Sequence, residues 1–108
     1  MPHFSIEYSA NLEAQIDIPA LLEVLRSAAI ETGLFPTAGI RIRAFRADHV
    51  SLADGNPQHA FLDLLIRLRE GRPQAAKEAA TAHIFKALEG FLAPSMVTHS
   101  IALSMEMR

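Results

Sequence analysis

Residues 39–69 read GIRIRAFRADHVSLADGNPQHAFLDLLIRLR and contain two strand patterns separated by a turn signal. From Gly39 to Ala53 the segment is rich in β-branched and aromatic residues, and isoleucines alternate with arginines, which predicts a strand. The run from His59 to Arg69 places its apolar residues on one face, namely Ala60, Leu62, Leu64, Ile66 and Leu68. Because Asp54-Gly55-Asn56-Pro57 is a strong turn signal, we expect the two strands to pair as a hairpin.

The segment before this pair predicts a strand followed by a helix. Residues 3–9, HFSIEYS, alternate apolar and polar side chains at a period of two, which is typical of a strand with one buried face. From Ile18 onward the apolar residues recur at helical spacing. Asp17 is placed to cap this helix, Pro19 falls in its first turn, and Gly33 marks its end.

The segment after the pair repeats the same order. The Ala-rich stretch from Pro73 to about Leu92 has an apolar stripe at helical spacing, so it predicts a second helix. After Pro94, residues 98–107 read THSIALSMEM and alternate again, which predicts a closing strand.

The predicted order is β-α-β-β-α-β, with two β-α-β units at about residues 2–53 and 58–107 of a single domain covering residues 1–108. Right-handed parallel crossovers would give a four-stranded sheet with two helices on one face. The expected fold class is therefore α/β in the broad sense, and α+β in the narrower one. The other face of the sheet would then lack a cover. Another subunit is the simplest cover, so we expect an oligomer.

Composition excludes several classes of function. The net charge of −2 and the absence of a Lys/Arg-rich run argue against nucleic acid as a partner. The chain has no cysteine, which excludes disulfides and thiolate nucleophiles. Its amino terminus has no basic and apolar leader pattern, and no stretch reaches the length of a membrane span, so we expect a cytoplasmic protein without a membrane partner.

The common catalytic motifs are also missing from the sequence. It contains no Gly-rich phosphate loop, HExxH motif or Ser-centred elbow, and its five histidines are scattered without the spacing of metal ligands. We therefore expect no metal and no organic cofactor.

Pro2 is the residue with the most unusual potential chemistry. An initiator methionine is normally removed before a small second residue, and removal of Met1 would leave Pro2 as a free secondary amine at the start of a strand. Burial and nearby guanidinium groups would both disfavour the charged form of this amine and lower its pKa. Pro2 would then be a usable general base near neutral pH.

Several further stretches carry a family resemblance. The longest and most specific is TGLFPTAGIR at residues 32–41, and the others are Met1–Phe4 with Glu7, Ala53–Gly55, Ala60–Phe61, Gly71–Arg72 and Ala102–Ser104. Together they resemble the 5-carboxymethyl-2-hydroxymuconate isomerase family of the tautomerase superfamily, whose members share the duplicated β-α-β units. The resemblance also implies a longer C-terminal segment than the one that follows the last predicted strand here.

The resemblance implies a homotrimer with active sites near subunit boundaries and Pro2 as the catalytic base. It further implies that Arg41 and Arg72 hold the carboxylates and the oxo or enol oxygen of the substrate. From the residues alone, Arg41 lies on an alternating strand opposite its apolar face, and Arg72 lies in the connection before the second helix. Arg43 shares the side of Arg41 and is a third candidate. Three further charged residues could alter the charge of the pocket, namely Asp63, Arg67 and Arg69.

The expected reaction relocates a proton on an unsaturated 2-hydroxy or 2-oxo polycarboxylate, with 5-carboxymethyl-2-hydroxymuconate as the first choice of substrate. Two alternatives stay open at this point. One is a relative that acts on another substrate, such as a phenylpyruvate-type enol or a halogenated acid. The other is a non-catalytic trimeric binding module in which the proline is blocked or the arginines point outward.

Overall fold

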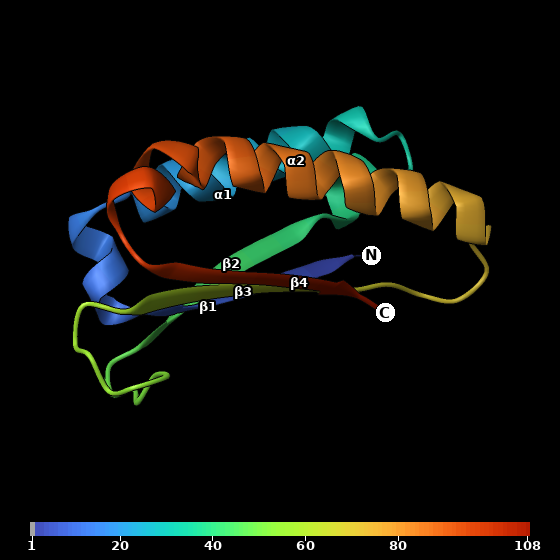
Figure 1. Cartoon of the computed structure of the whole chain (residues 1–108). Coiled ribbons are helices and arrows are strands. Elements are labelled where there is room, and N and C mark those ends of the chain that lie inside the picture. Colours follow the sequence, from blue (N-terminus) through green and yellow to red (C-terminus); the bar gives the residue numbers. More distant parts are fainter. Residues whose placement is uncertain (1) are drawn as a thin grey trace.

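The computed structural model describes residues 2–108 and shows a four-stranded sheet with two helices packed on one face (Figure 1). The first unit consists of β1 (His3–Ser9), α1 (Ile18–Glu31) and β2 (Arg41–Ala47). The second consists of β3 (Ala60–Arg67), α2 (Gln74–Thr98) and β4 (Ile101–Met107). Two short 3-10 helices, η1 (Ala10–Ala14) and η2 (Thr37–Gly39), lie in the first half. The predicted fold class and element order are confirmed.

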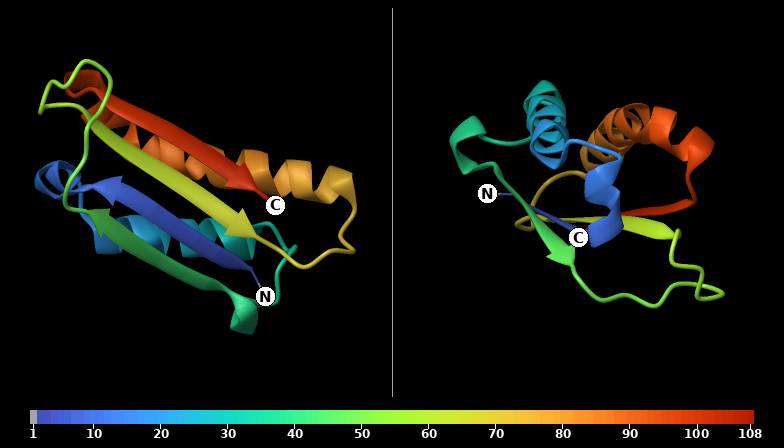
Figure 2. Two further views of the ribbon diagram at one scale, coloured as in Figure 1. Left: turned by 90° about the horizontal axis from the view of Figure 1, so that it is seen from below. Right: turned by 90° about the vertical axis from the view of Figure 1, so that its left-hand side faces the viewer.

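The strand order β2-β1-β3-β4 corrects the predicted hairpin (Figure 2). β1 pairs in parallel with β2, β3 pairs in parallel with β4, and the two units join through the antiparallel β1–β3 pair. The predicted hairpin partners, β2 and β3, are therefore separated by β1. Burial agrees with this order, because alternate residues of β1 and β3 are buried, whereas the inward residues of β2 are partly buried or, at Arg46, exposed, which suits an edge strand.

The core lies between the sheet and the two helices. The inward side chains of the central strands are inaccessible to solvent, and those of the helices pack against them at helical spacing. The fully buried side chains of this core include Phe4, Ile6, Leu21, Leu25, Leu62, Leu64, Ile66, Ile84, Leu88 and Leu92. This alternation fixes which residues of each strand face away from the helices.

Helix α1 begins and ends as the sequence predicts. The Asp17 carboxylate accepts a hydrogen bond from the Ala20 N–H at 3.1 Å, and Pro19 lies in the first turn. Gly33 follows the helix with a φ of +67°, a conformation that costs glycine little.

Replacing this cap tests the account of α1. Asp17→Ala is expected to lower the free energy of unfolding by about 1 kcal/mol, because the Ala20 N–H loses its acceptor. Urea denaturation of both proteins at neutral pH measures the difference. Asp17→Asn, which keeps an acceptor oxygen, should lose less, and equal stability of Asp17→Ala and wild type would contradict the capping role.

Helix α2 is longer than predicted and continues through Pro94 to Thr98. A proline inside a helix lacks an N–H and crowds the carbonyl four residues earlier, here that of Gly90. Both Pro94 and Gly90 are exposed, so water can satisfy the released carbonyl on the solvent side of the helix. The buried stripe on the opposite side, which includes Leu88 and Leu92, is unaffected.

The face of the sheet that points away from the helices carries polar, charged and apolar side chains. No element of residues 2–108 covers this outer face, as Figure 2 shows. Its members are His3, Ser5, Glu7, Arg41, Arg43, Phe45, Phe61, Asp63, Leu65, Arg67, Ala102, Ser104 and Glu106. Phe45 is 55% exposed here, a high value for a phenylalanine. Within the described residues, neither helix has the length and apolarity needed to cross a membrane.

Candidate active site at the start of β1

Pro2 lies at the end of the sheet, directly before β1. Its side chain is fully buried, and its carbonyl accepts a hydrogen bond from the Arg41 N–H at 3.1 Å. Pro2 continues the alternation of Phe4 and Ile6, which face the helices. The residue proposed from the sequence as a base therefore lies in an apolar environment next to the first residue of β2.

Arg41 approaches this end of β1 from the outer face. It pairs in register with His3, is exposed, and directs its Nη1 donor to the carbonyls of Ala38 at 2.8 Å and Ile40 at 3.2 Å. Both carbonyls belong to η2 and the residue after it, so the segment TAGI holds the guanidinium close to the start of β2.

Arg72 approaches from the side of the helices. Its guanidinium carbon lies 5.7 Å from the centre of the Phe35 ring, and its Nε donates to the Leu34 carbonyl at 3.5 Å. Phe35 in turn packs edge to face against Phe4, with the ring centres 6.1 Å apart. The structure thus joins Pro2 and Arg41 through a backbone hydrogen bond, with the Arg41 guanidinium directed to the carbonyls of residues 38 and 40, and it links Arg72 to the same strand through two aromatic rings.

Phe35 belongs to the candidate site through its packing, which the sequence did not indicate. It belongs to the TGLFPTAGIR stretch, but periodicity gives no reason for a buried aromatic residue in a connection. The structure supplies the reason, because the buried Phe35 ring fills the space between Phe4 and the guanidinium of Arg72.

A group of cationic and imidazole side chains lies on the outer face beside Pro2. We call His3, Arg41, Arg43 and Arg67 the cationic cluster. His3 lies opposite Arg41 on one side and Arg67 on the other, and the Arg43 Nη2 donates to the His3 Nδ1 at 3.1 Å. Because arginine only donates, His3 must accept at Nδ1, which leaves its ring neutral with the proton on Nε2.

The cluster lowers the pKa of His3 below its ordinary value of 6.5, through partial desolvation first and then through the charges of Arg43, Arg67 and Arg41. The His3 ring proton signal is therefore expected to titrate at a lower pH in the folded protein than in urea-unfolded protein. Since the unfolded chain takes up this proton more readily, stability falls as the pH drops below the unfolded value. NMR titration of both states measures the difference, and a midpoint above the unfolded one would contradict the contact with Arg43.

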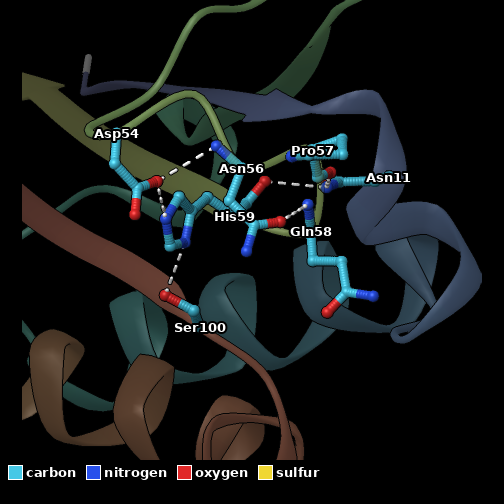
Figure 3. Close-up of polar contacts among 7 residues, drawn as sticks. All are labelled: Asn11, Asp54, Asn56, Pro57, Gln58, His59 and Ser100. Atoms are coloured by element: carbon cyan, nitrogen blue, oxygen red, sulfur yellow. Dashed lines mark hydrogen bonds and ion pairs between the residues drawn. The ribbon is translucent and has the colours of Figure 1, made fainter.

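A second polar group lies at the opposite end of the sheet (Figure 3). There the His59 ring lies 2.8 Å from an Asp54 carboxylate oxygen and 3.0 Å from the Ser100 hydroxyl, and Asn11 donates to the His59 carbonyl at 2.8 Å. The pKa of Asp54 lies below its ordinary value. The largest cause is the hydrogen bond that its carboxylate accepts from the Asn56 N–H, and the contact with His59 is the next. These contacts fasten the connection between β2 and β3 to η1 and β4. The turn signal of residues 54–57 thus anchors a connection and does not close a hairpin.

The donor set of the described residues does not favour a metal centre. Between residues 2 and 108, no three or more side chains of the His, Asp and Glu types gather closely enough to hold a metal ion.

Comparison with known proteins decides the family. The sequence model of the 5-carboxymethyl-2-hydroxymuconate isomerase family matches residues 2–108. The chain belongs to this isomerase family. It is 32% identical over 106 residues to the Escherichia coli 5-carboxymethyl-2-hydroxymuconate Delta-isomerase, covering 98% of this chain and 84% of that relative. The resemblance stated from the sequence is confirmed.

Solved structures agree with membership of the isomerase family. A crystal structure of 5-carboxymethyl-2-hydroxymuconate delta-isomerase superposes with a TM-score of 0.95 at 29% identity, covering 100% of this chain and 82% of that one. A fused 4-OT described as a wild-type symmetric trimer has a TM-score of 0.71 at 16% identity, with 97% and 84% covered. The similarity to the fused 4-OT shows that proteins outside this family have the same fold.

Proposed function

We propose that the chain isomerises 5-carboxymethyl-2-hydroxymuconate, with the nitrogen of Pro2 as the general base after removal of Met1. Met1 itself lies outside the described residues. Membership of the isomerase family supports the reaction class. The observation that carries the assignment of the base is a fully buried Pro2 directly before the start of β1, with its carbonyl accepting a hydrogen bond from the backbone N–H of Arg41.

The proposed step moves one proton and needs no other reactant. The Pro2 nitrogen takes the proton of the 2-hydroxyl group, and the electron pair of that O–H bond forms the C=O bond. The conjugated double bonds shift along the chain, and a distant carbon takes the proton back from the Pro2 nitrogen. The product is the conjugated ketone, and the base returns to its neutral form.

The environment of Pro2 favours a neutral nitrogen. Burial penalises the protonated form, and the guanidinium groups of Arg41 and Arg72 would repel a further positive charge. Both effects would lower the pKa of an unacylated Pro2 below that of a free proline amine. The base would then be available near neutral pH.

The arginines supply binding and charge stabilisation. A guanidinium group can hold a carboxylate through two parallel hydrogen bonds, which fixes both position and orientation. Negative charge builds up on the substrate oxygen as its proton leaves, and a positioned cation stabilises that charge in the transition state. We assign these two tasks to Arg41 and Arg72, which approach the start of β1 from opposite faces of the sheet.

We also propose that the protein is a homotrimer whose subunits cover one another's outer sheet face. The exposed Phe45 and the uncovered face support this, and so does the shared fold of a fused 4-OT described as a symmetric trimer. Light scattering coupled to size exclusion is expected to give three times the 11.8 kDa mass of the chain. A monomer at micromolar concentration would contradict the trimer.

The function is tested by following the absorbance of three classes of substrate with protein whose N-terminus is Pro2. We expect turnover of 5-carboxymethyl-2-hydroxymuconate that exceeds turnover of a phenylpyruvate-type enol or a halogenated acrylic acid. A preference for either of the others would assign a different substrate to the same base. Absence of turnover for all three would favour a binding module. As part of this proposal, the reaction belongs to cytoplasmic catabolism of aromatic acids such as homoprotocatechuate.

A further inference from the structure

The connection between α1 and β2 places a buried aromatic ring beside Arg72. This ring belongs to Phe35, which is only 6% exposed although it lies in neither a helix nor a strand. It packs edge to face against Phe4, and Phe4 lies two residues after Pro2 on the same side of β1. The core thus holds the Phe35 ring on the face of the sheet to which Pro2 also belongs.

Few polar contacts hold the guanidinium of Arg72. Its Nε donates to the Leu34 carbonyl at 3.5 Å and its Nη1 to the Arg69 carbonyl at 3.2 Å. Both distances exceed the about 2.9 Å that is usual for such bonds, so both bonds are weak. Among residues 2–108 Arg72 forms no ion pair, whereas Arg26 and Arg108 each face a glutamate. Two long hydrogen bonds do not by themselves fix a guanidinium group in one orientation.

The Phe35 ring supplies a further contact to this guanidinium. The central carbon of the Arg72 guanidinium lies over the ring at 5.7 Å from its centre, which is within the range where the negative face of a ring attracts a cation. No acceptor in the described part of the chain is bonded to the Arg72 Nη2. Both N–H groups of Nη2 are therefore available to an anion.

We propose that Phe35 is a positioning residue of the isomerase, which holds Arg72 in the orientation that leaves its Nη2 donors for a carboxylate or the enol oxygen of the substrate. The inference rests on the proposed function, because it gives a support to the task already assigned to Arg72. Phe35 acts through Arg72 and takes no part in the proton transfer. An aliphatic side chain would not replace it, because only an aromatic ring has a negative face that attracts a cation.

The test is a double-mutant cycle of Phe35→Leu and Arg72→Ala, read as kcat/KM for 5-carboxymethyl-2-hydroxymuconate. We expect Phe35→Leu alone to lower kcat/KM about 5- to 30-fold, because a misplaced cation stabilises the transition state less. The loss should be divided between kcat and KM in the same way as for Arg72→Ala. In the Arg72→Ala background, Phe35→Leu should change kcat/KM by less than about twofold, because the group that it positions is gone.

Phe91→Leu is the matched control for the loss of a ring from the core. Phe91 is also partly buried against the core, but it lies in the C-terminal half of α2, whereas Arg72 precedes the start of that helix. This variant should keep kcat/KM within about twofold of wild type. Circular dichroism shows whether each variant is folded under the assay conditions, and Phe35→Met takes the place of Phe35→Leu if the latter is unfolded.

The contact between the ring and the cation can also be measured without turnover. The ring current of Phe35 should shift the NMR signals of the δ-methylene protons of Arg72 upfield of those of Arg26, which lies over no ring among the described residues. The shift should disappear in Phe35→Leu. A role of Phe35 in core packing alone would not produce this shift.

The outcomes separate this inference from the proposed function. If wild type does not turn over the substrate, or if Arg72→Ala keeps wild-type kinetics, the proposed function is wrong and the inference falls with it. If Arg72→Ala is impaired but Phe35→Leu is not, or if Phe35→Leu lowers kcat/KM equally in both backgrounds, only the positioning role is wrong. Absence of the ring-current shift in wild type would also overturn that role, even if no variant of Phe35 folds.

Discussion

Protein that keeps Met1 is expected to be at least about 100-fold less active than protein that begins at Pro2, because general-base catalysis of this size is lost. Retained Met1 makes the Pro2 nitrogen part of an amide, which has no basic lone pair. The measurement is the rate of isomerisation by two samples whose N-termini are verified by intact mass.

The comparison of rates is valid only if the two samples have the same fold and the same oligomeric state. Circular dichroism and light scattering provide that control, and a binding module would treat both forms alike. Equal rates in the two samples would refute Pro2 as the base, although membership of the isomerase family would stand.

Arg72→Ala and Arg41→Ala are each expected to lower kcat/KM by about 30- to 1000-fold, or 2–4 kcal/mol in the transition state. The loss should fall on both kcat and KM, because each cation would bind a carboxylate and one would also stabilise charge on the substrate oxygen. Steady-state kinetics on 5-carboxymethyl-2-hydroxymuconate measures it.

Stability measurements separate this effect from damage to the fold. The two arginines make hydrogen bonds to carbonyls at the protein surface, and Arg72 adds a contact with Phe35 worth about 1 kcal/mol or less. Neither variant should therefore unfold. Arg26→Ala is the matched control, and wild-type kinetics in either active-site variant would show that the arginine has been misassigned.

Local patterns predicted the elements of this fold better than they predicted its pairing. Alternation identified all four strands, and the Asp17 cap marked the start of α1. The order of strands in a sheet depends on how completely each strand is buried there. A turn signal between two strand patterns does not indicate whether those two strands are neighbours in the sheet. The residues 54–57 therefore indicated a hairpin, whereas they anchor a longer connection through His59.

The end of α2 was also predicted incorrectly from the sequence, because the helix continues to Thr98. Pro94 is a strong stop signal, but its effect depends on whether the carbonyl it releases can reach water. In α2 that carbonyl belongs to Gly90 on the exposed side, which the sequence alone does not show.

The candidate site was predictable as a list of residues and less so as an arrangement. Pro2, Arg41 and Arg72 followed from unusual chemistry at the terminus and from family resemblance. Their placement on opposite faces of the sheet depends on the register of β1 with β2 and on the packing of Phe35. The cationic cluster depends on the same register, since Arg41, Arg43 and Arg67 come from different strands than His3.

The central claim is that the Pro2 nitrogen is the base, and its titration in the folded protein is the most direct test. Protein labelled with ¹⁵N-proline and lacking Met1 gives the pKa of this nitrogen by NMR, and the pH dependence of kcat/KM gives the pKa of the catalytic base in the free enzyme. The account predicts that the two values agree, that they lie below the pKa of a free proline amine, and that the rate rises with pH through them. A Pro2 nitrogen that stays protonated throughout the pH range of full activity would contradict it.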